Sequence, residues 1–340
     1  MSNYILTNEN AIYYECNYSC DNVIFIKLGN ESFFITDARY TIEAKEKVKN
    51  TEVIESSDLI KSAQEILKKE KIKEIIFDGN DFTYNKFNKL TENLKVNFTN
   101  QVNFSHLKRV IKTDDEIAIL KKAAKIGRNG FERLAKYINK NGLNKKETLL
   151  HFKAVEAYKN MGKYDLSFDP IIAINENAAK PHALPTNKKL QKNDLLLVDA
   201  GVKYKRYCSD RTCTASFGGE LSFSRKQKFK SKKQQKIYDL VYKAQLNAIE
   251  NAKVGMKAKD IDNLTRSVIE KAGFGKYFIH STGHGVGLDI HEHPYINSKS
   301  DVVIEDNMVF TIEPGIYLPN EFGVRIEDTI VMKNGKAVIL

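Results

Sequence analysis

The second half of this 340-residue chain concentrates side chains that could bind metal ions. The segment 280–291 reads HSTGHGVGLDIH, so three imidazoles recur there between glycines that let the backbone and a metal approach closely. Two strand-like segments, 194–210 and 308–328, carry acidic residues on either side of it. One histidine and four carboxylates form a donor set suited to metal ions, and the carboxylates are Asp199, Asp210, Glu313 and Glu327.

The first acidic pair is predicted to lie on a β-hairpin. Its turn is centred on residues 204–205, and positions equidistant from that centre face each other, which places Asp199 opposite Asp210. Directly opposed side chains of an antiparallel pair stand roughly 4.5 to 5.5 Å apart at Cβ. Two carboxylates so placed repel each other unless a cation lies between them.

The second acidic pair follows the same spacing rule. A loop centred on Asn320 makes Glu313 and Glu327 equidistant from the turn. Acids that face inward from strands as apolar as these would be buried anions without partners, which proteins avoid. Exposed acids on edge strands are the alternative, but metal binding resolves the conflict and is the interpretation we favour.

The types of the five candidate ligands indicate which metal they bind. Oxygen-rich, hard donors favour Mn²⁺ (manganese) or Co²⁺ before Zn²⁺, and five ligands are enough for two divalent ions if some of them bridge. Ions roughly 3.5 to 4 Å apart would hold a hydroxide between them at neutral pH and polarise a carbonyl group. The sequence therefore predicts a dinuclear site with hydrolytic chemistry.

Length predicts two domains, and a composition of 42% hydrophobic and 29% charged residues predicts that they are globular. The alternation of strands and helices implies the α/β (α+β) class. Residues 1–110 alternate short strands with helices: 23–36 are typical of a hairpin and 58–71 have helical spacing. Residues 111–340 form the second domain, whose first helix begins with a capping box at 113–116.

The second domain contains the elements that must position the candidate ligands. The loop after a buried strand at 171–174 holds His182 between two prolines. The linker 225–236 contains seven basic residues and is interpreted as an exposed excursion, with a polyanion contact as the weaker alternative. Further helices are predicted at segments of helical spacing: 145–161, 234–252 and 258–272.

Composition also limits where the protein works and what it binds. A basic-then-apolar leader and a run of eighteen apolar residues are both absent, so we expect a soluble, cytoplasmic protein that does not enter membranes. Four cysteines, at positions 16, 20, 208 and 213, are interpreted as ordinary thiols rather than as a disulfide scaffold or a zinc site. Nucleic-acid binding is not expected, although the net charge is +11.

Four motifs together resemble a known enzyme family. The segments DAG…SD, HSTGHGVGLDIHEHP, FTIEPGIY and GVRIED look like those of the proline-specific metallopeptidases of the pita-bread fold, Xaa-Pro aminopeptidase and Xaa-Pro dipeptidase (prolidase). TDARY at 36–40 resembles the creatinase-like N-terminal domain of the same family. The resemblance implies a C-terminal pita-bread domain, a homodimer, and a peptide substrate with proline at its second position.

The same resemblance implies a role for each candidate ligand. Asp199 would chelate one metal ion, and His284 and Glu313 the other, while Asp210 and Glu327 would bridge the two. In this family the glutamate of TIEPG also serves as the general base for the attacking water, so Glu313 takes that role.

Four further residues resemble catalytic positions of the family. His182, in PHALPT, is similar to the histidine that steadies the tetrahedral intermediate. His280 and His291 flank the ligand histidine and resemble groups that position the substrate. Arg325 resembles the arginine of the proline-specific members, and Tyr317 matches a neighbouring family position.

Two alternatives stay open at this point. Methionine aminopeptidase has a similar fold and ligand set, but Arg325 and the N-terminal domain oppose that interpretation. A non-catalytic pita-bread module that binds protein or nucleic acid is opposed by the presence of all five ligands. The chain also departs from the family pattern, most visibly at Cys213, where an arginine is common, and at Arg206, where a glycine is frequent.

Overall fold

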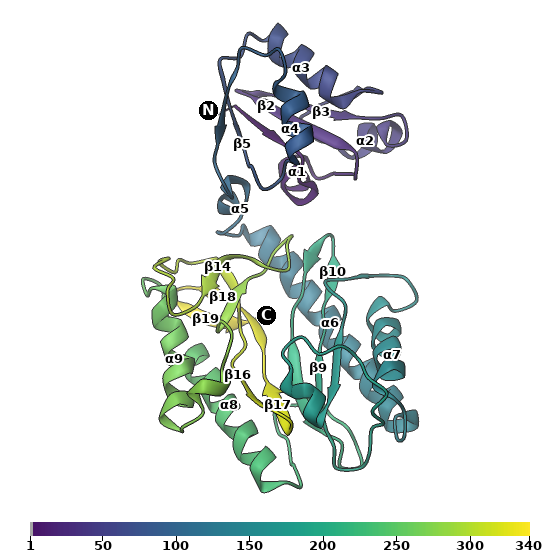
Figure 1. Ribbon diagram of the computed structural model, residues 1–340, viewed down its shortest axis with the longest axis vertical. Helices are drawn as coiled ribbons and strands as arrows, with labels where there is room; N and C mark the ends of the chain where they lie inside the picture. Colours follow the sequence, from purple (N-terminus) through teal and green to yellow (C-terminus); the bar gives the residue numbers. More distant parts are fainter. Residues whose placement is uncertain (1–2) are drawn as a thin grey trace. The chain divides into compact units, whose positions relative to one another are not determined.

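The computed structural model describes residues 3–340, which form two compact units, one ending at Lys108 and the other running from Arg109 to Leu340 (Figure 1). Each unit combines helices with β-sheet, which confirms the mixed α/β class. None of the helices within residues 3–340 is both long enough and apolar enough to cross a bilayer.

The first unit is built on a six-stranded mixed sheet in the order β4-β3-β2-β1-β5-β6. Its strands are β1 (Tyr4–Leu6), β2 (Val23–Leu28), β3 (Glu31–Thr36), β4 (Glu52–Glu55), β5 (Glu74–Phe77) and β6 (Asn97–Asn100). Its helices are α1 (Glu9–Cys16), α2 (Thr41–Lys47), α3 (Leu59–Lys69), α4 (Tyr84–Thr91) and α5 (Phe104–Lys108). The hairpin β2–β3 and the helix α3, which Asp58 caps, both match the sequence prediction.

Both faces of this sheet are covered. Successive side chains of a strand point to opposite faces, so Phe25 of β2 packs with Phe34 in one core, whereas Ile26 packs with Leu67 of α3 in the other. The first unit is thus a sandwich of helices around a central sheet.

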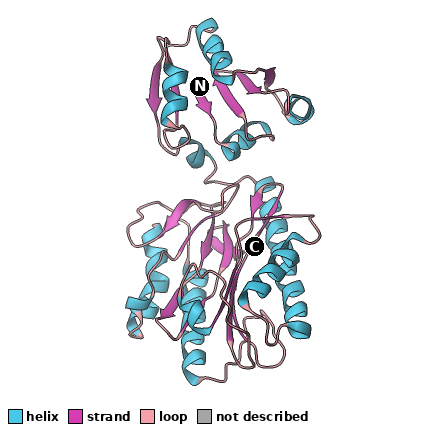
Figure 2. Cartoon of the chain, turned by 45° about the vertical axis from the view of Figure 1, so that its right-hand side comes forward, coloured by secondary structure: helices cyan, strands magenta, loops and turns pink. Residues whose placement is uncertain are grey.

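The second unit places helices outside and strands inside (Figure 2). The helices are α6 (Asp114–Asn141), α7 (Glu147–Lys159), α8 (Lys232–Asn251) and α9 (Ala258–Lys271), with 3₁₀ turns η1 (Asn175–Ala179) and η2 (Gly275–Tyr277). The strands of the first half are β7 (Asp165–Leu166), β8 (Ile171–Ile174), β9 (Leu195–Asp199), β10 (Val202–Tyr204), β11 (Tyr207–Cys208) and β12 (Thr212–Ser216). Those of the second half are β13 (Gly283–Gly285), β14 (Glu292–Ile296), β15 (Val309–Ile312), β16 (Gly315–Leu318), β17 (Phe322–Arg325), β18 (Asp328–Lys333) and β19 (Lys336–Ile339).

These strands form four small sheets, in the orders β11-β10-β7, β12-β9-β8, β14-β13-β15-β18-β19 and β16-β17. The helix α6 begins with the predicted capping box, in which the Thr113 hydroxyl accepts from the Glu116 N–H and the Glu116 carboxylate accepts from the Thr113 N–H. The predicted loop after β8 is correct except for its first turn, which is η1.

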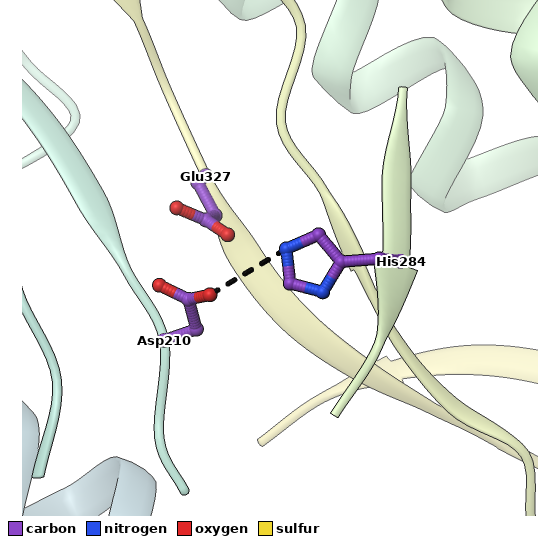
Figure 3. A group of neighbouring side chains, drawn as sticks. All are labelled: Asp210, His284 and Glu327. Atoms are coloured by element: carbon purple, nitrogen blue, oxygen red, sulfur yellow. Dashed lines mark ion pairs between the residues drawn. The ribbon is translucent and has the colours of Figure 1, made fainter. Parts of the chain in front are cut away.

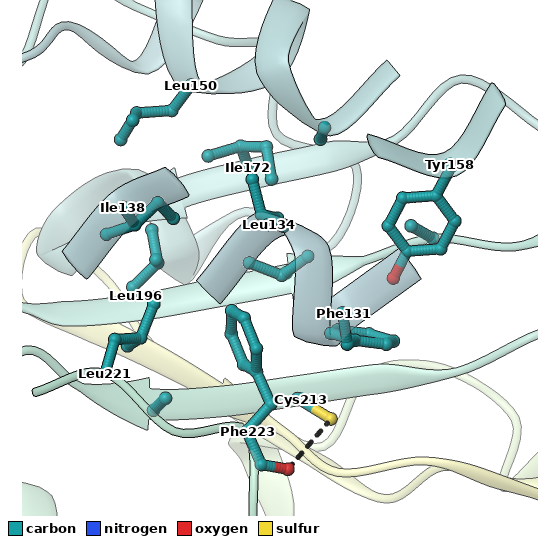
Figure 4. Close-up of a cluster of buried hydrophobic side chains, with 14 of the residues drawn as sticks. Phe131, Leu134, Ile138, Leu150, Tyr158, Ile172, Leu196, Cys213, Leu221 and Phe223 are labelled. Carbon is teal, nitrogen blue, oxygen red and sulfur yellow. Dashed lines mark hydrogen bonds between the residues drawn. The ribbon is translucent and has the colours of Figure 1, made fainter. Parts of the chain in front are cut away.

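The strand β9 lies at the centre of the second unit. Leu196 and Val198 pack into a core with α6 and α7 (Figure 4), whereas Leu195 and Leu197 pack into a second core with α8, β16 and β17. Because side chains alternate along a strand, Asp199 continues the face of Leu195 and Leu197. The alternation therefore directs this carboxylate away from the core of α6 and α7.

The first predicted hairpin exists, but its register differs from the prediction. The two turn residues are Lys205 and Arg206, both at positive φ (48° and 68°), as in a type I′ turn. This turn sets Asp199 opposite Thr212 in the β9–β12 pair. Asp210 lies between β11 and β12, so the predicted direct opposition of Asp199 and Asp210 is wrong by two residues.

The second hairpin has the predicted register. The pair β16–β17 sets Gly315 opposite Arg325 around a loop that contains Asn320. The pair β15–β18 keeps that register on the other side of Glu313 and Glu327. The two glutamates therefore lie at equivalent points of the two arms, in the short gap between the two ladders.

Candidate metal centre

A single cavity of about 720 Å³ in the second unit collects the residues that the sequence singled out. Its walls also include apolar side chains, among them Phe168, Ile171 and Ile290. All nine predicted site residues line it: His182, Asp199, Asp210, His280, His284, His291, Glu313, Arg325 and Glu327. Segments that are far apart in the chain thus meet at one place.

Three of these side chains form the tightest group of donor atoms. Asp210, His284 and Glu327 each present one ligand atom, and these atoms lie within 4.8 Å of one another. Figure 3 shows the two carboxylates and the imidazole pointing toward one another from three different segments, with His284 Nε2 3.6 Å from Asp210 Oδ2. The Thr212 hydroxyl donates to Glu327 Oε2 at 2.7 Å and orients that carboxylate.

Glycines on either side of His284 let β13 approach its neighbours. A Cβ atom on Gly283 would lie 1.9 Å from the carbonyl oxygen of Thr311, so no other residue fits without moving β15. The same Thr311 donates from its hydroxyl to Glu313 Oε1, at 3.1 Å. Glu313 Oε1 lies 3.3 Å from His284 Nε2, which brings a fourth donor to the group.

The fifth predicted ligand, Asp199, faces the same cavity from the end of β9. Its Oδ2 accepts from Arg325 Nη2 at 2.6 Å. Its Oδ1 is buried and has no hydrogen-bond partner, which is costly for an anion. Asp199 therefore holds one carboxylate oxygen available for a further cation.

The pKa values of the candidate ligands reflect how closely their carboxylates are packed. Burial, followed by the neighbouring carboxylates, holds the pKa values of Asp210 and Glu327 well above their usual range. Burial also opposes ionisation of Glu313, but the hydrogen bond and charge of His284 outweigh it and lower the pKa of Glu313 to about 2. The raised pKa values of the two acids show that the site resists carrying this much negative charge, which divalent cations would offset when bound.

The other histidines surround this group. His182 and His291 are exposed at the cavity wall, and the His291 ring lies 4.3 Å from that of His284, centroid to centroid. His280 is half-buried, and burial lowers its pKa. Its Nδ1 donates to the Ser281 carbonyl at 2.7 Å, so in the neutral ring Nε2 accepts from the Tyr317 hydroxyl at 2.8 Å.

Arg325 connects the ligand Asp199 to this histidine. Its Nη1 donates to the Tyr317 hydroxyl at 2.8 Å and to the Pro181 carbonyl at 3.1 Å. Because Tyr317 in turn bonds His280, the arginine links a metal-ligand candidate, a rim histidine and the loop of His182.

Comparison with known proteins identifies the family. Residues 118–334 match the model of metallopeptidase family M24, and residues 1–117 match the creatinase/prolidase N-terminal domain. The chain belongs to metallopeptidase family M24. The pita-bread fold with a creatinase-like first domain, and the resemblance to proline-specific members, are thereby confirmed.

Relatives of this M24 chain extend over nearly its whole length. An uncharacterized peptidase of Bacillus subtilis (strain 168), YqhT, is 34% identical over 98% of this chain and 92% of its own. The structure of an Xaa-Pro dipeptidase from Bacillus anthracis superimposes with a TM-score of 0.91 at 33% identity, covering 99% of this chain and 92% of that one. An X-Pro aminopeptidase from Thermotoga maritima gives 0.89 at 28% identity, covering 100% and 95%.

Membership of M24 implies divalent metal ions, and the residues present fit them. The donors are four carboxylates and one imidazole, the hard, oxygen-rich set that such ions prefer. The buried, unpartnered Oδ1 of Asp199 and the three ligand atoms gathered by Asp210, His284 and Glu327 are the structural observations that carry this fit.

The sequence did not predict one residue that positions the site. Glu147, at the start of α7, is fully buried, and its carboxylate accepts from the Ile174 N–H, the Asn177 side chain, and the N–H and hydroxyl of Thr186. These bonds enclose the loop that carries His182. A glutamate in the first turn of a helix is so common that its sequence position alone gave no signal.

Proposed function

We propose that this M24 peptidase hydrolyses the peptide bond between an N-terminal residue and a following proline, with two divalent metal ions, Mn²⁺ before Co²⁺ or Zn²⁺. The observation that carries the proposal is that one cavity is lined by all five donors together with the three further histidines and Arg325. The named structural relatives, an Xaa-Pro dipeptidase and an X-Pro aminopeptidase, support the substrate class.

In this proposal Asp199 would hold one ion and His284 and Glu313 the other, with Asp210 and Glu327 available to both. Divalent ions supply Lewis acidity, which makes water a nucleophile at neutral pH and polarises the scissile carbonyl. Asp210 and Glu327 each present a carboxylate oxygen within 4.8 Å of the other and of a His284 nitrogen, which supports their binding an ion together.

The protein's own groups then move the protons and stabilise the charge. Glu313 accepts the proton of the attacking water on its carboxylate and returns it to the proline nitrogen as the C–N bond breaks. His182, exposed at the cavity wall, donates to the substrate carbonyl oxygen as it gains negative charge, and His291, exposed at the same wall, helps to position the peptide. His280 positions the peptide, and Arg325 keeps its ring and Asp199 in place through Tyr317.

Proline at the second position is compatible with such a site, whereas the preference for proline is what the family resemblance and the named relatives support. An Xaa-Pro bond has no N–H, so a peptidase that holds substrate through that donor loses a contact. A cavity that binds the carbonyl side through cations and histidines loses nothing. The tertiary amide therefore costs this site less than it costs an ordinary peptidase.

The test uses the full chain, stripped of metal with a chelator and reloaded with Mn²⁺. We expect hydrolysis of Ala-Pro, Ala-Pro-Ala or both after reloading, and loss of turnover without metal. The ratio of the two rates separates a dipeptidase from an aminopeptidase. Cleavage of Met-Ala-Ala but of neither proline peptide would instead assign a methionine aminopeptidase activity.

Two further parts of the proposal have simple tests. A homodimer is what the family resemblance implies, and light scattering of the purified chain should give twice the mass of 38.8 kDa. A cytoplasmic location is supported by four free, buried cysteines within the described residues, and cell fractionation tests it.

A further inference from the structure

The basic linker 225–236 differs from its predicted role at its first residue. The sequence pattern predicts an exposed excursion, and Lys226, Lys228 and Lys230 are indeed exposed. Arg225 is not, since its side chain is only 18% exposed and its own carbonyl accepts from the Tyr238 hydroxyl of α8 at 3.1 Å. The last residues of the linker form the start of α8.

The Arg225 guanidinium lies behind the candidate ligand Glu327. Its Nη2 donates to the Glu327 carbonyl at 2.8 Å, and its Nη1 reaches the Thr212 carbonyl at 3.5 Å. Those two peptide groups already meet, because the Glu327 N–H donates to the same Thr212 carbonyl at 3.0 Å. The arginine thus reinforces the one backbone link that joins Glu327 to β12.

The same guanidinium binds the residue that follows the ligand. Its Nη2 forms an ion pair with Asp328, whose carboxylate also accepts from Gln245 Nε2 at 3.2 Å. Gln245 is buried on α8 and donates as well to the carbonyl of Ile312 at 3.2 Å. Ile312 precedes Glu313 and Asp328 follows Glu327, so the network joins the arms that carry both glutamates.

Asp328 has a second cationic partner, because Nε of Arg211, the residue before β12, lies 3.3 Å from its Oδ1. The strand β12 itself adds no arginine or lysine. Position 213 of β12 is a cysteine, whose Sγ lies 3.9 Å from Arg225 Nη1. A thiol is a single weak donor and cannot bind two carbonyls and a carboxylate at once. A planar guanidinium with several donors can, which is why an arginine rather than a lysine fits here.

We infer that Arg225 is a positioning residue for the metal centre, acting on Glu327 through its carbonyl and on Glu313 through Asp328 and Gln245. It touches neither substrate nor the candidate ligand atoms; it holds the backbone from which two ligands project. The inference rests on the proposed metal-dependent function, since positioning is defined here by the ions that the ligands bind.

The test measures Mn²⁺ binding to the metal-stripped full chain by calorimetry and by the Mn²⁺ electron paramagnetic resonance spectrum. Arg225→Gln should weaken Mn²⁺ binding about 10- to 100-fold, the usual effect of losing a group that orients metal ligands. High Mn²⁺ should restore part of kcat, with KM for the peptide unchanged. Arg225→Lys should fall between, because it keeps the charge but loses the planar fork. The control Lys226→Gln changes an exposed neighbour in the same linker and should change nothing.

Each outcome decides the question. Unchanged Mn²⁺ affinity in folded Arg225→Gln overturns the inference, and so does a loss of thermal stability with unchanged affinity. If Arg225→Gln does not fold, Gln245→Met decides, because it removes the link between Asp328 and Ile312 at similar volume and should weaken Mn²⁺ binding several-fold. If the native chain binds no Mn²⁺, the proposed function itself is wrong. If the native chain and Arg225→Gln bind Mn²⁺ with equal affinity, only the role of Arg225 is wrong.

Discussion

The two units of the molecule bury charge in very different ways. Among residues 3–108 the buried charged side chain is Asp78, whose carboxylate accepts backbone N–H groups of Asn80 and Asn103. The second unit buries charge of both signs: Arg109, Lys112, Glu116, Glu147, Asp199, Asp210, Asp262, Glu292, Arg325, Glu327 and Asp328.

This contrast separates charge that is paired within the fold from charge that is not. Buried charge is unfavourable unless it is paired or hydrogen-bonded, and a hydrophobic replacement is often at least as stable. Some charges in the second unit are paired internally, as Lys112 is with Glu292 at 2.6 Å. Asp210 and Glu327 instead face other acids across the cavity, an arrangement that helps binding of cations rather than folding.

The largest expected effect is the loss of kcat when Glu313 is changed, because this catalytic chemistry belongs to the second unit and not to the first. Glu313→Gln removes the proposed general base and one ligand charge, so kcat should fall at least about 10²- to 10⁴-fold. Steady-state kinetics at saturating Mn²⁺ measures it, with circular dichroism to verify the fold. Activity within tenfold of the native chain would show that another group takes the proton.

The next largest effect should be the loss of stability when the buried ion pair of Lys112 and Glu292 is broken. Lys112→Met should leave the Glu292 carboxylate, 2% exposed, without its cation and lower the free energy of unfolding by about 3–5 kcal/mol. Denaturant unfolding measures the loss. The matched double variant Lys112→Met with Glu292→Gln should recover part of it, and no recovery would mean that the loss comes from packing rather than from charge.

In the first unit, stability should depend mainly on apolar packing. Leu67 of α3 is fully buried against the sheet, so Leu67→Ala should lower the free energy of unfolding by about 2–5 kcal/mol. Mn²⁺ affinity should stay at the native value, because this unit contributes no candidate ligand. A tenfold weaker affinity in a folded Leu67→Ala protein would contradict the division between the two units.

Counted per ion, metal removal should have the smallest of these effects, and the loss should be confined to one unit. At Mn²⁺ one hundred times above its dissociation constant, each bound ion stabilises the folded state by about 2.7 kcal/mol. Hydrogen exchange with and without chelator should show that loss in peptides around β9, β13 and β17 and not in residues 3–108. Equal changes in both units would indicate that the ions act on the whole chain.

Local patterns in the sequence determined much of this protein. The order and chemical type of the ligands, the spacing around Asn320, the capping box at Thr113 and the alternation of β9 are properties of single segments, so they can be read one segment at a time. The same segments carry the family motifs, which is why the fold was predictable.

Tertiary structure decided the rest. The turn at Lys205 and Arg206 gives the hairpin a register two residues away from the predicted one. Arg225, in the basic linker, donates to the backbone carbonyl of Glu327 instead of facing solvent. Glu147 accepts hydrogen bonds from the loop that carries His182. The places of Arg225 and Glu147 depend on which distant backbone groups need a hydrogen-bond partner in the folded second unit. A charged side chain then occupies the place where its hydrogen bonds offset the cost of burial, and that place exists only in the folded molecule.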